Sequence, residues 1–294
     1  MAHLLYHWRL ENYLRDLDMG VGFHLNQKSP VLHQIEKGDS LWAFTRFVQP
    51  NGALFYVLAA RLVCHGKTKN PDGFRYGLYR VYGDLERSRY FRVVGQPNIT
   101  PLIRGFPLAT GQDSTPLGQA FQGNAAVRVI GEDQHLALLE WSKDFEVEPR
   151  AQLLPEDILE RQDDFVLSGL SSDLGFNTSM SEARRQYLLT KSRTRRGVLV
   201  TQLKDMYDGR CQISGWNPRA EFGRDLCEAH HIQWLSRGGE DEMSNLILVS
   251  PNIHRMIHAL DAPFDYQELA FRADLDVDIK IKWIDSSHKI IPNE

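Results

Sequence analysis

Short apolar and aromatic runs alternate with turn-forming residues through the first half of the chain. The runs are LLYHWRL, DSLWAFTRF, LFYVLAARLV, YGLYRVYG and RYFRVV, and such aromatic and β-branched runs favour strands. Turn clusters containing Gly38, Gly52 and Gly73 separate them. We therefore expect residues 1–145 to form a mostly β domain, a small barrel or curled sheet, with one helix near residues 133–142.

The pattern changes at about residue 146. Two stretches of helical periodicity, interrupted by a polar loop, predict a helical connector over residues 146–192. Residues 193–294 then form a third unit, with a helix in TRRGVLVTQLKDMYDG, a strand in LCEAHHIQWL and a short apolar run, NLILVS. Ser250-Pro251 predicts the start of a further helix, because serine is favoured at the N-cap and proline at the first helical position. The fold class indicated is α+β.

Composition narrows the class of protein. The chain has 294 residues, of which 42% are hydrophobic and 24% charged, typical of a soluble protein with about two domains. No apolar run reaches the roughly 18 residues of a transmembrane helix, and the N-terminus lacks the apolar core of a signal peptide. We expect a cytoplasmic location and no membrane partner. The three cysteines lack C-x-x-C spacing, which predicts reduced thiols.

Charge is distributed unevenly, although the net charge is only −4. Residues 184–224 contain ten Arg/Lys and three Asp/Glu, whereas residues 225–294 contain six and thirteen. A basic band beside an acidic segment suits an enzyme that binds phosphates and holds a cation, and an ordinary solvated face would give the same asymmetry.

Four of the eleven histidines lie within 29 residues of the third unit. His254 and His258 are four apart on a predicted helix, so their rings project from one face. His230 and His231 are neighbours on a predicted strand and point to opposite faces. One of them can bind a metal with the helix pair, while the other acts as a base beside the substrate. Three imidazoles around a divalent cation leave positions for a phosphate oxygen and water.

These residues, together with Gly238-Gly239 and Ser244-Asn245-Leu246, resemble the HNH, or ββα-metal, endonuclease family. Within it they are similar to the branch with two adjacent histidines, which includes nuclease colicins and McrA-like restriction enzymes. The resemblance implies a C-terminal nuclease domain over residues 193–294 that hydrolyses DNA with one divalent ion, Mg²⁺, Mn²⁺ or another transition metal. It implies that His230, His254 and His258 bind the metal, that His231 is the general base, and that Asn245 braces the loop.

Supporting residues surround this motif. Glu228 lies two positions before His230, on the same strand face, and is expected to partner a metal ligand. Arg195 or Arg196 is expected to approach the phosphate or to pair with Glu228. Many members of the family carry a structural zinc held by two C-x-x-C pairs. Here the matching positions hold Cys211 with Ser214, and Ser250 with Ile253, so no structural zinc is expected.

The N-terminal domain resembles EVE domains of the PUA-like superfamily. The resemblance is carried by Tyr6-His7-Trp8, by residues 38–44 and by YVLAARLV from Tyr56. EVE and the related SRA domains read modified bases, so the resemblance implies a PUA-like (EVE/SRA-type) barrel that recognises them. A flipped base needs aromatic faces and a few polar groups, which these residues could supply: Tyr6, Trp8, Trp42, Phe44, Tyr79, Tyr82 and Asp84. Of these, Trp8, Trp42 and Asp84 are the preferred pocket residues. Burial in the barrel core is the more common role for a strand aromatic.

Fusions of EVE or SRA domains to HNH domains are modification-dependent restriction endonucleases. The resemblance therefore predicts a prokaryotic, cytoplasmic, homodimeric enzyme that cuts double-stranded DNA containing 5-methyl- or 5-hydroxymethylcytosine. Two other functions remain open: a nonspecific DNase of the HNH type, and a reader of modified nucleic acid with a vestigial nuclease.

Overall fold

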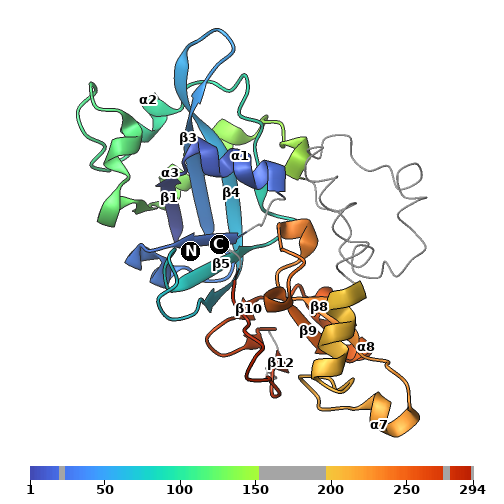
Figure 1. The fold of residues 1–294 in the computed structure, drawn as a ribbon. Coiled ribbons are helices and arrows are strands. Elements are labelled where there is room, and N and C mark those ends of the chain that lie inside the picture. Colours follow the sequence, from blue (N-terminus) through green and yellow to red (C-terminus); the bar gives the residue numbers. More distant parts are fainter. Residues whose placement is uncertain (20–23, 152–196, 274–278, 293–294) are drawn as a thin grey trace. The chain divides into compact units, whose positions relative to one another are not determined.

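The computed structural model describes residues 1–19, 24–151, 197–273 and 279–292, which fall into two compact units (Figure 1). Unit 1 comprises Met1–Leu17, Phe23–Lys67 and Gly73–Ala151; unit 2 comprises Asp18–Gly22, Thr68–Asp72 and Gln152–Glu294. Most of the expected helical connector, and both Arg195 and Arg196, lie outside the described residues.

Unit 1 is built on a seven-stranded sheet. Its strands are β1 (His3–His7), β2 (His24–Gln27), β3 (Ser40–Val48), β4 (Leu54–Lys69), β5 (Tyr79–Gly83), β6 (Arg89–Tyr90) and β7 (Val127–Ile130). The order is β2-β5-β4-β3-β1-β7, and β6 pairs with β4. Strands β1 and β3 are parallel, whereas β3 and β4 are antiparallel. The order is an open path, so the described strands do not form the closed barrel expected from the sequence; the α+β class is confirmed.

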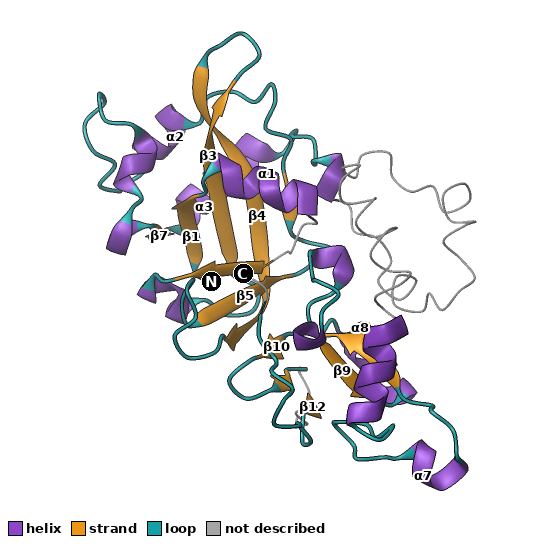
Figure 2. Cartoon of the chain, in the orientation of Figure 1, coloured by secondary structure: helices purple, strands orange, loops and turns teal. Residues whose placement is uncertain are grey.

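Side chains are buried on both faces of this sheet. Successive residues of a strand point to opposite faces, and Leu4, Leu5 and Tyr6 of β1 are all buried. Leu5 packs in a cluster with Trp42 and with residues of α2 (Thr100–Arg104) and α3 (Glu132–Ser142). Figure 2 shows helix α1 (Leu10–Met19) crossing the sheet strands. The sheet is therefore a covered layer, and its aromatic residues are largely core.

The helices of unit 1 differ in how well the sequence predicted them. The expected helix near residues 133–142 is confirmed as α3. The run LLYHWRL was expected to be one strand, but β1 ends at His7 and α1 begins at Leu10. Short 3₁₀ helices complete the unit: η1 (Pro30–Gln34), η2 (Leu117–Ala120), η3 (Gly123–Ala125) and η4 (Pro149–Ala151). Among the described residues of the whole chain, no helix has the length and apolarity needed to cross a membrane.

Unit 2 contains a β-hairpin followed directly by a helix. Residues 197–206 are helical and precede α7 (Pro218–Phe222). The hairpin pairs β8 (Glu228–His231) with β9 (Leu246–Val249) in antiparallel register, and α8 (Pro251–Leu260) follows. Two 3₁₀ turns, η5 (Leu235–Arg237) and η6 (Met243–Asn245), lie between the strands, and β10 (Phe264–Asp265), β11 (Ala270–Phe271) and β12 (Ile279–Lys280) form a small sheet. The strand predicted in LCEAHHIQWL is confirmed as β8, and the apolar run NLILVS forms β9. The helix start is also confirmed, with Ser250 at the N-cap.

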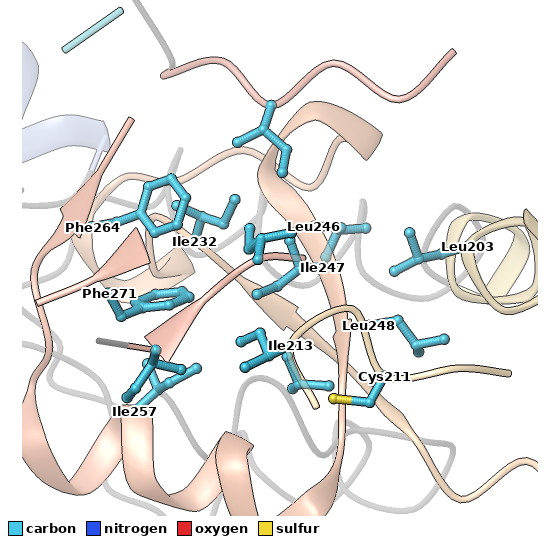
Figure 3. Packing of buried hydrophobic residues seen from close by; sticks show 14 of the residues in the cluster. Leu203, Cys211, Ile213, Ile232, Leu246, Ile247, Leu248, Ile257, Phe264 and Phe271 are labelled. Atoms are coloured by element: carbon cyan, nitrogen blue, oxygen red, sulfur yellow. The ribbon is translucent and has the colours of Figure 1, made fainter. Parts of the chain in front are cut away.

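A hydrophobic cluster holds this hairpin and helix together (Figure 3). All four residues of β9 are fully buried, and Ile257 of α8 packs in the same cluster. Phe264 and Phe271 close it from the small sheet. Burial of one such side chain contributes about 1.5–3 kcal/mol, so the cluster fixes β8 and α8 as a stable frame.

All three cysteines are free thiols, as the sequence predicted. Burial raises the pKa of Cys64 and of Cys227 to about 12. At Cys211 burial acts in the same direction, but hydrogen bonds from Ser214, Ile213 and Ser250 outweigh it and lower the pKa of the thiol. Ser214 and Ser250, two of the positions compared above with zinc-binding cysteines, thus lie against the Cys211 sulfur. The expected lack of a structural zinc stays a prediction.

Candidate metal centre

Three histidines from two elements converge beside the hairpin. His230 is on β8, and His254 and His258 lie one turn apart on α8. The His230 ring centroid is 5.0 Å from that of His254 and 4.9 Å from that of His258. One ligand nitrogen from each ring lies within 4.8 Å of the others, so the three residues could hold a metal ion.

The spacing of the two helix histidines fits shared coordination. Their Nε2 atoms are 3.1 Å apart. Two nitrogens bound at about 2.0–2.1 Å to a tetrahedral ion lie about 3.3 Å from each other. The same distance also suits an N–H···N hydrogen bond between the rings. Imidazole ligands favour zinc, iron, nickel or copper over magnesium, which prefers oxygen.

Glu228 determines which nitrogen His254 presents. The Glu228 Oε2 atom lies 2.6 Å from His254 Nδ1. A carboxylate can only accept a hydrogen bond, so Nδ1 donates its proton and Nε2 keeps its lone pair for the cluster. The structure thus places Glu228, which the sequence predicted to partner a metal ligand, in contact with His254.

Aromatic rings pack beside the other two ligands. The Trp234 ring lies 4.8 Å from that of His258, and the Phe271 ring lies 5.6 Å from that of His230. His230 is fully buried and His258 half-buried. These apolar neighbours restrict how the two imidazoles can turn, so the ligand set is partly preorganised.

His231 points away from the three ligands, as alternation along β8 requires. Its side chain is 1% exposed, and its Nε2 atom lies 2.9 Å from Oδ1 of Asp241, whose side chain is 3% exposed. Sequence reasoning did not identify Asp241. The available signal was an acidic residue two positions after the Gly238-Gly239 pair and four before Asn245.

Asn245 joins the two ends of the loop between β8 and β9. Its Oδ1 accepts a hydrogen bond from the backbone N–H of Gln233 at 2.8 Å. Its Nδ2 donates to the carbonyl oxygens of Gln233 and Glu240, each at 2.9 Å. The side chain is buried and uses its amide on both sides of the loop, which is the geometry of a brace.

The glycine pair allows this loop to close. Gly238 has a φ of +80°, a left-handed conformation that glycine adopts without strain. A Cβ atom on Gly239 would lie 1.9 Å from the carbonyl oxygen of Gln233, so no larger residue fits there. Arg237 stacks its guanidinium 4.3 Å from the Trp234 ring centroid and pairs with Asp261 at the end of α8. The loop is therefore tied to both β8 and α8.

The residues predicted to bind a base in unit 1 do not form one cluster. Leu5 pairs with Trp42 in the sheet, so Trp42 shares a face with Leu5 and the adjacent Tyr6 points to the other face. Trp42 is fully buried and donates from Nε1 to Nδ1 of His135 at 3.0 Å. A base-binding role for Tyr6 and Trp42 stays a prediction.

The other two of these residues have evident structural contacts. Trp8 is half-buried and packs edge-on against Tyr13 and Tyr90. The Oδ1 of Asp84 accepts hydrogen bonds from the backbone N–H groups of Glu86 and Arg87, which stabilises the turn before β6. Their predicted contact with a base is likewise open.

Comparisons with known proteins add little to this geometry. No protein-family model and no curated protein matches the chain. A solved structure described as "Modification dependent TagI restriction endonuclease" matches with a TM-score of 0.26 and 12% sequence identity, over 97% of this chain and 77% of that chain. Similarity at this level supports no conclusion about fold or activity, so the function must be argued from the residues of the site.

Proposed function

We propose that the protein is a metal-dependent DNA endonuclease of the HNH type, with its nuclease domain in residues 193–294. The observation that carries this proposal is the convergence of His230, His254 and His258 from a hairpin strand and the helix that follows it. The order of elements agrees with the ββα arrangement that the motif implies. A fourth histidine, His231, lies on the opposite face of the strand and would act as the general base.

Each residue has a distinct task in this proposal. His230, His254 and His258 would hold the cation, which when bound would neutralise negative charge on the scissile phosphate and on the departing 3′ oxygen. His231, as a neutral imidazole, takes a proton from the attacking water. Glu228 keeps the proton of His254 on Nδ1. Asn245 braces the loop between β8 and β9, which lies next to His231.

The substrate proposed is double-stranded DNA containing 5-methyl- or 5-hydroxymethylcytosine. It is supported by the resemblance of residues 1–145 to EVE domains, and we propose a PUA-like architecture for this part. Residues 146–192 would connect it to the nuclease domain. Because one site cuts one strand, a homodimer would supply a site for each strand.

Cleavage of matched DNA substrates tests this function. Identical duplexes with unmodified, 5-methylated or 5-hydroxymethylated cytosine are incubated with the protein, with and without Mg²⁺, Mn²⁺ or Zn²⁺. We expect metal-dependent cutting of modified duplexes only. Equal cutting of all three would instead show a nonspecific DNase, and binding without cutting under every metal would show a reader.

A His231→Ala variant tests the assignment of the base. Removal of the proton acceptor should lower the cleavage rate by about 10²–10⁴-fold while DNA binding and metal binding stay at wild-type levels. Cleavage by His231→Ala at the wild-type rate would refute the proposed mechanism.

A further inference from the structure

Within the described part of the chain, the buried carboxylate of Asp241 has a single hydrogen-bond partner. Its Oδ1 contacts His231 Nε2 at 2.9 Å, and its Oδ2 is buried without a hydrogen bond. Burial of a carboxylate is unfavourable unless it is paired. A carboxylate that served to brace the loop would accept several N–H groups, and the Asn245 amide already performs that task. The contact with His231 is therefore the interaction that Asp241 is placed to make.

We propose that Asp241 is the positioning residue of the base His231. The carboxylate can only accept, so Nε2 of His231 carries the ring proton and donates it. In a neutral imidazole the other nitrogen, Nδ1, is then the one without a proton. Asp241 thereby selects Nδ1 as the nitrogen that can accept a proton from the attacking water. This inference rests on the proposed nuclease function for its role, though not for its geometry.

The two carboxylate–histidine pairs of the site hold the ring proton on opposite nitrogens. Glu228 holds the proton of His254 on Nδ1 and leaves Nε2 for a metal. Asp241 holds the proton of His231 on Nε2, so that Nδ1 is the nitrogen without a proton. The Glu228 side chain is 49% exposed, whereas that of Asp241 is 3% exposed. Because water screens it less, the buried pair fixes its ring nitrogen more firmly.

The loop geometry keeps Asp241 in place. Asn245 binds the backbone of Glu240, the residue directly before Asp241, and also that of Gln233, two residues after His231. The side-chain amide therefore spans the two segments that hold the carboxylate and the imidazole. The distance between them is fixed by the same brace that closes the loop.

¹⁵N NMR tests directly which ring nitrogen of His231 carries the proton. The full-length protein is labelled with ¹⁵N-histidine, and the His231 signals are assigned by comparison with His231→Ala, in metal-free and Zn²⁺-loaded samples. We expect His231 to be the Nε2–H tautomer in the wild type and to lose this single tautomer in Asp241→Asn. A wild-type His231 with its proton on Nδ1, or an unchanged tautomer in Asp241→Asn, would overturn the inference.

Kinetics then test the consequence for cleavage. Asp241→Asn should lower kcat by about 10²–10⁴-fold, the usual contribution of a general base, with unchanged KM, Zn²⁺ affinity and unfolding midpoint. Glu242→Gln removes one carboxylate from the adjacent, exposed position and should match the wild type in every measurement. A wild-type kcat in Asp241→Asn, or a loss explained by weaker metal binding or unfolding, would refute the inference.

The nuclease function and the role of Asp241 can be refuted separately. If the wild type cuts no DNA under any metal while the tautomer changes in Asp241→Asn, the nuclease function is refuted and the coupling of Asp241 to His231 is supported. If the wild type cuts DNA and Asp241→Asn leaves both tautomer and kcat unchanged, the function stands and the role of Asp241 is refuted.

Discussion

At His254 the proton sits on Nδ1 because Glu228 can only accept it. No proton has to leave Nε2 of His254 when a metal binds, since Nε2 is already the deprotonated nitrogen. Without the carboxylate the ring would sample both tautomers and both flipped orientations. Part of the metal affinity of the cluster should therefore come from a residue that is not a ligand.

A Glu228→Gln variant measures this contribution. The neutral amide accepts a weaker hydrogen bond than the carboxylate, so Zn²⁺ affinity should fall by about 10–100-fold in calorimetric titration. Glu242→Gln, which leaves the charge beside His254 intact, should bind Zn²⁺ as the wild type does. Equal affinities for Glu228→Gln and the wild type would show that the pair has no effect on metal binding.

The sequence could predict the histidines but not their second carboxylate. Spacing alone placed His254 and His258 on one helix face and separated His230 from His231, because helix and strand periods are fixed. Glu240, Asp241 and Glu242 are three consecutive acids in a loop. Which of them is buried depends on how the loop closes, and that information lies in tertiary packing.

At the scale of elements, the loop between β8 and β9 is as constrained as the strands it joins. Its closure brings the backbone of Gly239 so near to Gln233 that a methyl group would overlap the carbonyl oxygen. The atom that the methyl group would overlap belongs to the backbone, so it cannot rotate away as the end of a side chain could. The loop would have to open, and Asn245 would lose contacts with Gln233 or Glu240.

Gly239→Ala should therefore destabilise unit 2 by about 3 kcal/mol or more, the upper range for overpacking. Gly223→Ala is the matched control, because Gly223 has a φ of +65° but open space around its Cβ position, and it should cost about 1–2 kcal/mol. Urea unfolding followed by tryptophan fluorescence compares them, with Trp234 in the loop itself. Equal midpoints for the two variants would contradict the steric argument.

Element prediction succeeded where the local pattern had one interpretation. The strand β8 was predicted from its residue pattern and the helix α8 from the Ser250-Pro251 start signal, and the apolar run NLILVS forms β9. Helix α1 was missed, although Leu10, Tyr13, Leu14 and Leu17 have helical spacing, because the aromatic run before it favours a strand. Closure of a barrel depends on pairing between distant strands, which no local pattern contains.

At the scale of the whole molecule, the dependence of stability on pH involves two histidines of unit 1 whose imidazoles stay neutral. Burial, followed by the charges of Arg9 and Arg46, lowers the pKa of His7 to about 4. Burial, followed by the proximity of His3, lowers the pKa of His135 to about 4. His135 also accepts the Trp42 Nε1 hydrogen bond at Nδ1, which only a deprotonated nitrogen can do.

These two pKa shifts make folding sensitive to acid in a defined range. The ordinary pKa of histidine is 6.5, so between about pH 6.5 and 4 the unfolded chain binds protons that the folded chain excludes. The free energy of unfolding must then fall as the pH falls through this window, and the loss from these groups is complete below pH 4. The effect is opposite in sign to that of a histidine stabilised by a carboxylate.

His135→Gln separates this contribution from general acid effects. A glutamine oxygen can still accept from Trp42 Nε1 but cannot titrate, so the loss of unfolding free energy between pH 7 and pH 5 should be smaller than in the wild type, with His7 retaining the remainder. Urea unfolding at the two pH values measures it, and His33→Gln, at an exposed position, should keep the full wild-type pH dependence. If His135→Gln lost as much stability as the wild type, protonation of the buried His135–Trp42 pair would not be the cause, and the acid sensitivity of unit 1 would have to originate at His7 and the carboxylates.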